Sequence, residues 1–174
     1  MNEAVAASSN DLTAPSLRRR LASFLYEGVL LFGVVVIADY LFASLVQQRH
    51  AMYLRVPGMA FLFVVLGIYF IWFWARSGQT LAMKTWHIRV VAHDGGRVTQ
   101  ARALARYLAA WLWFLPPLAV ADRIGVKNLG GGGTLAVFAG YVTAYAVLSL
   151  LHPQRQFLHD VLCGTRLVTW RPAG

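Results

Sequence analysis

The chain has 174 residues, enough for one domain, and 58% of them are hydrophobic while only 13% are charged. These values lie far from those of an ordinary soluble domain and indicate membrane-spanning segments. The net charge is +9, but the basic residues are spread between apolar runs and form no long block. This distribution favours contact with anionic lipid headgroups over nucleic acid as the partner. A single cysteine, Cys163, excludes an intrachain disulfide and a multi-cysteine metal site.

The polar residues 1–17 are expected to form a disordered cytoplasmic N-terminus. The first apolar run extends over about 21–46, and Glu27 and Asp39 interrupt it. An export signal needs an uncharged apolar region, so these two acids indicate a retained membrane anchor. The second run, about 56–75, carries no charge and is long enough to cross a hydrocarbon core of about 30 Å as a helix.

The segment between the second and third runs, residues 76–106, has a pattern of its own. The apolar residues Trp86, Ile88 and Val90 alternate with residues 87, 89 and 91, and this period of two predicts a strand. Residues 94–96, Asp-Gly-Gly, predict a tight turn. Arg97-Val98 is expected to begin the return strand of a small cytoplasmic β-hairpin. A second strand-like piece, residues 165–170, could pair with this hairpin and tie the C-terminus to it.

After the hairpin, Thr99 has the residue type of a helix N-cap. Arg102 and Arg106 are four positions apart on the predicted helix, so we expect both to face lipid headgroups. The third apolar run, about 107–121, is short for a span, and Pro116-Pro117 should kink or end it. It either re-enters the membrane or crosses with the help of residues that precede it.

The fourth run, about 134–151, is a further predicted span. Residues 154–170 then combine a short amphipathic helix, with Gly164 as its natural C-cap, and the strand-like piece. His152 and His159 are seven positions apart, but this spacing does not give a defined metal-ligand set. We therefore expect no metal and no cofactor, and because no nucleophile–base arrangement is visible we expect no enzyme.

The distribution of positive charge predicts the orientation. With the N-terminus inside and four spans, twelve of the sixteen Lys and Arg residues fall on inside segments. The outside loops hold the other four, which are Arg49, Arg55, Arg123 and Lys127. This positive-inside bias predicts that both termini are cytoplasmic.

Glu27 lies where a helix facing hydrocarbon should already have begun. It is seven residues after Arg20, so the two share a helical face and are separated by roughly 10 Å along the axis. An ionised carboxylate facing lipid at the bilayer centre costs about 2.5 to 3.5 kcal/mol, so Glu27 is expected to face inward toward a partner. Asp160, on the short C-terminal helix, should lie at the same depth. The predicted result is an Arg20–Glu27–Asp160 cluster.

Asp39 is a second intramembrane acid. It follows Glu27 by twelve residues, which places it roughly 120° around the helix and nearer the outer surface. One cytoplasmic cluster therefore cannot hold both acids of the first span. Asp39 is either a further step of an ion path or a solvated or paired residue near the helix end.

The order of these features resembles the RDD family of bacterial inner-membrane proteins, named for an arginine and two aspartates. The most specific parts are GQTLAMK, which begins at Gly78, and HDVLCGTRLV, which begins at His159. The likeness covers about residues 18–170. By position the family's arginine looks like Arg20, with Arg19 as the rival, and its two aspartates look like Glu27 and Asp160. The chain departs from the pattern because glutamate replaces the first aspartate and Ala82 replaces the second glycine of the usual GQTLG.

The resemblance implies a small multi-pass protein of the bacterial inner membrane, and a few family members are thought to act in transport, including sodium/proton exchange. The predicted fold is all-α, a bundle of about four transmembrane helices with a small cytoplasmic β-hairpin. The leading hypothesis is transport of a small ion or solute through the Arg20–Glu27–Asp160 cluster, in a homo-oligomer because four spans are few for a transporter. The alternative is a non-transporting scaffold or accessory protein. In it the cluster is a structural clamp, and the hairpin and the Arg102/Arg106 helix bind a membrane protein partner.

Overall fold

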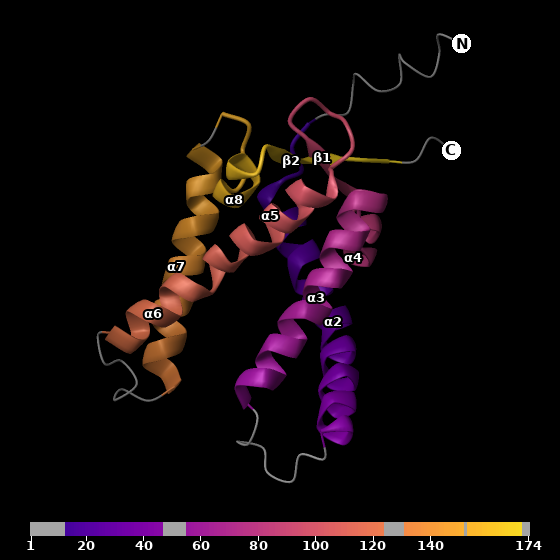
Figure 1. Cartoon of the computed structure of the whole chain (residues 1–174). Coiled ribbons are helices and arrows are strands. Elements are labelled where there is room, and N and C mark those ends of the chain that lie inside the picture. Colours follow the sequence, from indigo (N-terminus) through magenta and orange to yellow (C-terminus); the bar gives the residue numbers. More distant parts are fainter. Residues whose placement is uncertain (1–12, 47–54, 124–130, 152, 172–174) are drawn as a thin grey trace.

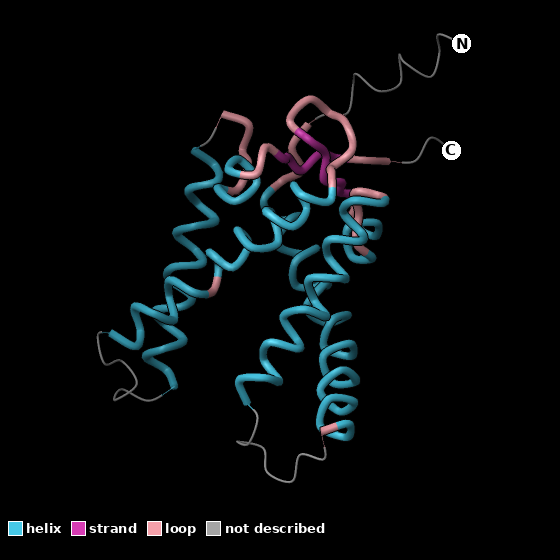
Figure 2. Tube along the Cα trace, in the orientation of Figure 1, coloured by secondary structure: helices cyan, strands magenta, loops and turns pink. Residues whose placement is uncertain are grey.

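The computed structural model describes residues 13–46, 55–123, 131–151 and 153–171. Within these residues the chain is mostly helical and carries one two-stranded sheet (Figures 1 and 2). Four helical stretches are long and apolar enough to cross a membrane, namely Leu17–Leu45, Val56–Arg76, Gln100–Arg123 and Gly132–Leu151. The predicted number of helical stretches with the length and composition of spans is therefore confirmed. Most of the predicted disordered N-terminus, residues 1–12, lies outside the described residues.

The first two candidate spans are α2 (Leu17–Leu45) and α3 (Arg55–Arg76), which pack together along one side of the molecule (Figure 1). Ser16 caps α2 by accepting a hydrogen bond from the Arg19 backbone N–H. The 29 residues of α2 give a length of roughly 43 Å, more than a hydrocarbon core requires. Its outward side chains include Val29 and Phe32, which are 72% and 70% exposed. Such a surface suits contact with lipid.

The third candidate span is one helical stretch made of three successive segments. It consists of α5 (Gln100–Ala110), the 3₁₀ turn η1 (Trp111–Trp113) and α6 (Leu115–Arg123). Pro116 lacks the N–H that would bond to the Leu112 carbonyl, so the α-helical ladder cannot run through this point. The Tyr141 hydroxyl, on α7 (Gly131–Leu151), donates to that carbonyl at 2.9 Å. The predicted kink is confirmed, and the stretch reaches span length because α5 supplies residues before position 107.

The predicted β-hairpin is wrong. Strand β1 (Ile88–Ala92) pairs antiparallel with β2 (Thr165–Thr169), with Ile88 opposite Thr169. The turn at residues 94–96 does form, but Arg97-Val98 continues toward α5 without a strand. Both edges of β1 are already occupied. β2 takes one edge, and on the other the Gly78 carbonyl accepts from the Val90 N–H at 2.8 Å. The proposed pairing of residues 165–170 with this strand is confirmed.

The sheet, α4 (Leu81–Thr85) and α8 (Leu158–Leu162) form a cap at one end of the helices (Figures 1 and 2). Thr13 and Thr169, near the two ends of the described chain, join here through a 2.9 Å backbone hydrogen bond. Away from the cap, the α2–α3 pair and the α6–α7 pair spread apart (Figure 2). The main buried cluster gathers cap residues with residues from α3, α5, η1 and α7; it comprises Trp74, Met83, Ile88, Val90, Val98, Ala103, Tyr107, Trp113, Tyr145, Ala146, Phe157 and Leu167.

Candidate functional site

The structure divides the predicted charged cluster between two places, and the first is the environment of Glu27. Glu27 is 6% exposed on the buried stripe of α2 that also holds Arg20 and Ser23. The Tyr69 hydroxyl of α3 donates to Glu27 Oε1 at 2.6 Å. The Thr80 hydroxyl donates to Glu27 Oε2. The carboxylate therefore links α2, α3 and the start of α4 through two neutral hydroxyl groups.

Each of the residues Gly78, Gln79 and Thr80 contributes to holding this site. Gly78 has φ +72°, and a Cβ there would lie 2.6 Å from the Val90 carbonyl oxygen, so this position requires glycine. The Gln79 side chain donates to the Ile88 carbonyl at 2.8 Å and holds the segment against β1. Thr80 is the N-cap of α4, because its hydroxyl accepts from the Met83 N–H at 3.3 Å. The same hydroxyl is thereby aimed at Glu27.

The second place is the environment of Asp160, which is fully buried in the cap on α8. Arg106 Nε on α5 donates to Asp160 Oδ1 at 2.7 Å. The Arg106 guanidinium also lies 4.1 Å from the centre of the Trp74 ring, which adds a cation–π contact from α3. The Thr165 hydroxyl donates to the Asp160 backbone carbonyl at 3.2 Å and lies 3.4 Å from Oδ1. This ion pair therefore ties α8 to α5 and to the start of β2.

His159 extends this pair toward α7. The Tyr145 hydroxyl accepts from the His159 backbone N–H at 3.2 Å and lies 3.1 Å from its Nδ1. Its hydrogen is then free to point at Nδ1, which leaves the ring proton on Nε2, 3.6 Å from Asp160 Oδ2. Burial lowers the pKa of His159 to about 4, while the Asp160 charge opposes and the Arg106 charge reinforces that shift. The imidazole is therefore neutral at neutral pH.

Arg20 is associated with the Asp160 site. It is 4% exposed, its guanidinium stacks 4.5 Å above the Phe157 ring, and its charge interacts with that of Asp160. Its Nε and Nη1 atoms have no hydrogen-bond partner within the described part of the chain. Arg19, the rival for the family arginine, donates to the Trp86 carbonyl at 2.6 Å and ties α2 to the end of α4. The shared face of Arg20 and Glu27 is present, but the partners of the two residues differ.

The prediction that Arg102 and Arg106 both face lipid headgroups is wrong for Arg106. Arg106 is 5% exposed, whereas Arg102 is exposed. Positions 103, 106 and 107 form the face of α5 that packs against α3 and α8, and residue 102 lies outside that face. Asp39 lies on the exposed surface of α2, beside buried Ala38, as its angular separation from Glu27 indicates.

Sequence reasoning missed the partners of both acids. Tyr69 is the only tyrosine in the uncharged second run. It precedes Arg76 by seven residues, and Glu27 follows Arg20 by seven, so the two side chains are expected at the same depth in the membrane. Thr80 lies in the GQTLAMK motif and precedes a short helix, which is the pattern of an N-cap. Arg106, the partner of Asp160, is 54 positions away from it in the chain, so no local pattern links the two residues. In the described residues, no group of three or more His, Cys, Asp or Glu side chains could hold a metal ion.

Comparison of the sequence with known protein families identifies one that matches this chain. A sequence model of the RDD family matches residues 14–164, which is most of the chain and includes both acid sites. The comparisons with curated proteins and with solved structures give no match. The match agrees with the resemblance carried by GQTLAMK and HDVLCGTRLV, and the four apolar helices agree with a multi-pass membrane protein.

Proposed function

This chain belongs to the RDD family, and on that premise we propose that it carries a small cation, a proton or a sodium ion, across the membrane with Glu27 as the binding site. We place it in the bacterial inner membrane with both termini in the cytoplasm. Twelve of the sixteen Lys and Arg residues are then on the inside, and the two described chain ends meet at one end of the bundle.

The observation that supports the proposal is the kind of partner that Glu27 has. It is a buried acid in a candidate span, and Tyr69 and Thr80 hold it with neutral hydroxyl groups. A carboxylate held in this way can take up and release a proton without breaking an ion pair. Carboxylate and hydroxyl oxygens are also the ligands that hard cations prefer. Ionisable residues inside a membrane commonly mark ion pathways.

Asp160 is assigned the other role that was considered for the cluster, that of a folding clamp. Its charge is neutralised by Arg106 at 2.7 Å, and an arginine does not lose its proton in proteins. Asp160 therefore cannot change its charge without leaving Arg106 buried and uncompensated. The proposed transport site thus contains Glu27 alone of the three predicted residues.

The proposal includes a homo-oligomer, because four spans provide little protein around a path for ions. The alternative function is a non-transporting scaffold that binds a membrane partner, in which Glu27 would be a second clamp. A strictly monomeric protein would favour the scaffold.

Flux in proteoliposomes tests the proposal. The full chain is reconstituted with a pH-sensitive dye inside, and Na⁺ or K⁺ is added outside. We expect cation-dependent proton movement in the wild type and its loss in Glu27→Gln. Asp39→Asn is the matched control, because it removes one carboxylate from the same helix on the exposed face, and it should keep most of the flux.

Every variant is first checked by size exclusion, so that loss of folding is not counted as loss of transport. Full flux in a folded Glu27→Gln protein contradicts the assigned site. Absence of flux in folded wild type contradicts transport and supports the scaffold function. Equal loss in Glu27→Gln and Asp39→Asn would extend the path to both acids of α2.

A further inference from the structure

Arg19 lies in the first turn of α2 and reaches the chain where α4 ends. Its Nη2 atom donates to the Trp86 carbonyl at 2.6 Å and to the His87 carbonyl at 3.1 Å. Its Nη1 atom lies 3.4 Å from the Thr169 hydroxyl oxygen on β2. Trp86 is the C-cap of α4, so this guanidinium joins α2 to the last turn of the short helix. Hydrogen bonds from a charged donor are among the stronger ones in proteins.

The opposite end of α4 carries a donor to Glu27. Thr80 is the N-cap of α4, it is 1% exposed, and its hydroxyl donates to Glu27 Oε2. Thr80 and Trp86 are six residues apart, which is roughly 9 Å along the helix axis. A helix of five residues has little stability of its own, so the contacts at its two ends decide its position. A contact that holds Trp86 therefore also helps to hold Thr80 against Glu27.

The chain has a left-handed backbone conformation on each side of α4. Gly78 has φ +72° and His87 has φ +54°. Such a conformation is uncommon for residues other than glycine and persists where the surrounding structure holds it. The His87 carbonyl is held by Arg19 and by the Trp170 N–H, which donates to it at 2.8 Å. Loss of the Arg19 side chain removes one of these two contacts, so His87 is the joint at which α4 is released.

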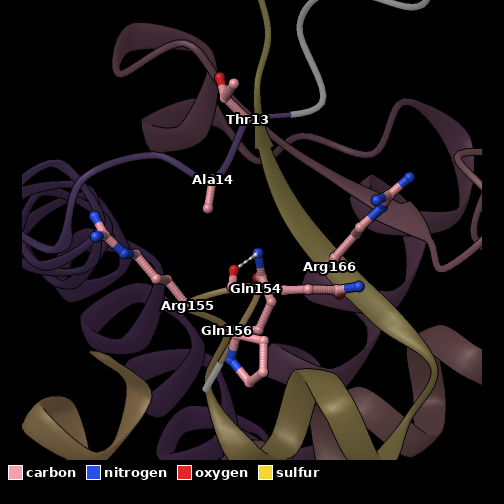
Figure 3. A pocket seen from close by; sticks show the side chains of 7 residues that line it. Thr13, Ala14, Gln154, Arg155, Gln156 and Arg166 are labelled. Carbon is pink, nitrogen blue, oxygen red and sulfur yellow. Dashed lines mark hydrogen bonds between the residues drawn. The ribbon is translucent and has the colours of Figure 1, made fainter. Parts of the chain in front are cut away.

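The same segment closes Glu27 toward the cap. Ala82 and Met83 of α4 are buried, and α4 packs against α2. A cavity of about 320 Å³ does lie in the cap, but its described walls come from residues 13–14, 153–156 and 166 (Figure 3). None of these wall residues belongs to α3 or α4, and Glu27 is not among them. This cavity therefore gives no route to Glu27, and access from the cap requires α4 to move.

We propose that Arg19 is a positioning residue for the cation site at Glu27. By holding the end of α4, it keeps Thr80 on the carboxylate and keeps the site closed toward the cap. When its hydrogen bonds break, α4 moves away and Glu27 opens to water on that side. The inference rests on the proposed function, because a site that carries ions has to open to each side of the membrane in turn. Access to Glu27 is measured without flux, so the two proposals fail separately.

Carboxyl labelling of the full chain in detergent micelles tests this role. The probe is a water-soluble carbodiimide with glycine ethyl ester, and peptide mass spectrometry gives the labelling rate of each acid. Arg19→Gln should raise the rate at Glu27 about 10- to 100-fold, which corresponds to the loss of a hydrogen bond from a charged donor. Asp160 is an internal control, because it is fully buried but is held by Arg106 and not by α4, and its rate should change by less than about twofold.

Two further variants separate positioning from a general loss of structure. Arg18→Gln is the matched control, because it removes the same charge from the neighbouring, exposed side chain and should change neither rate by more than about twofold. Arg19→Lys keeps a charged donor for the two carbonyls, so its rate at Glu27 should lie closer to the wild type than to Arg19→Gln. General loss of structure would instead raise the rates at Glu27 and Asp160 together.

Hydrogen exchange of the wild type keeps the test valid if Arg19→Gln fails to fold. Residues 81–86 should exchange faster than β1 and β2, because α4 opens without the rest of the cap. Exchange of α4 and the sheet at one common rate overturns the proposal, as does an unchanged rate at Glu27 or an equal rise at Asp160 in Arg19→Gln. The expected labelling in a protein without flux supports the role of Arg19 in holding α4 and overturns transport alone.

Discussion

Glu27 and Asp160 are both acids with almost no exposed surface, yet they are neutralised in different ways. Asp160 lies in the cap and is paired with Arg106 at 2.7 Å. Glu27 lies in α2 and receives hydrogen bonds from the hydroxyls of Tyr69 and Thr80. A permanent positive partner fixes the charge of the first acid, whereas neutral partners leave the charge of the second free to change. Burial alone therefore does not distinguish a clamp from an ion site, but the partner does.

The largest effect is expected from Asp160→Asn. It leaves the Arg106 guanidinium buried without its counter-charge, and removing one partner of a buried ion pair costs about 3 to 5 kcal/mol. We expect a loss of that size in the free energy of unfolding, measured by denaturant titration in detergent micelles. A lower yield of monodisperse protein should accompany it.

The double variant Arg106→Met/Asp160→Leu is the control for this prediction. It removes both charges and replaces them with apolar groups of similar size, so it should recover much of the lost stability. If the single and double variants are equally destabilised, the loss comes from packing, and the contrast between the two acids then weakens.

The next effect is a dependence of stability on pH through His159. Its pKa is lowered to about 4 by burial, and its neighbours are Asp160, Arg106 of α5 and Tyr145 of α7. Between pH 6.5 and 4 the unfolded chain binds a proton at this histidine and the folded protein does not, so stability falls as the pH falls. The loss is on the order of 3 kcal/mol once the pH is below 4, and it is absent above pH 6.5.

Unfolding free energies measured at several pH values check this prediction, with His159→Gln as the control. Glutamine keeps a hydrogen-bonding group near Tyr145 but does not titrate, so this part of the pH dependence should disappear. A wild-type slope that His159→Gln leaves unchanged would show that the acid sensitivity arises elsewhere, and the Glu27 site would be the first place to look.

Sequence patterns predicted the features that depend on neighbouring positions. The spans follow from apolar runs, the kink from Pro116-Pro117, the turn from Asp94-Gly95-Gly96, and the shared face of Arg20 and Glu27 from helical geometry. Each of these features depends on residues that are close together in the sequence, and the structure confirms each of them.

Partner choice was not predictable from the same patterns, because it depends on which distant elements meet. β1 pairs on one edge with β2, a strand more than seventy residues away in the chain. Residues 78–79 occupy its other edge, so no edge is left for residues 97–98. Arg106 is buried because α8 brings Asp160 against α5. The predicted Arg20–Glu27–Asp160 cluster assumed that equal depth implies contact, but α3 and α4 supply nearer hydroxyl groups to Glu27.

A smaller effect is expected from Thr80→Ala. It removes the N-cap of α4 and one of the two hydroxyl donors to Glu27, which together should cost about 2 kcal/mol of unfolding free energy. Thr80→Ser keeps the hydroxyl and should stay within about 0.5 kcal/mol of the wild type. If the serine variant is as unstable as the alanine variant, the threonine methyl group matters more than its hydroxyl.

The smallest effect on stability is expected from Glu27→Gln, and this variant is the sharpest test of the contrast. The amide has the same shape, and its carbonyl can accept from Thr80 while its NH₂ donates to the Tyr69 hydroxyl oxygen. Because no positive charge is left unpaired, the unfolding free energy should change by less than about 1 kcal/mol. Glu27→Leu leaves both hydroxyls buried without an acceptor and should cost about 1 to 3 kcal/mol. If Glu27→Gln instead destabilises the protein as strongly as Asp160→Asn, then the Glu27 charge itself holds the fold together, and both acids are clamps.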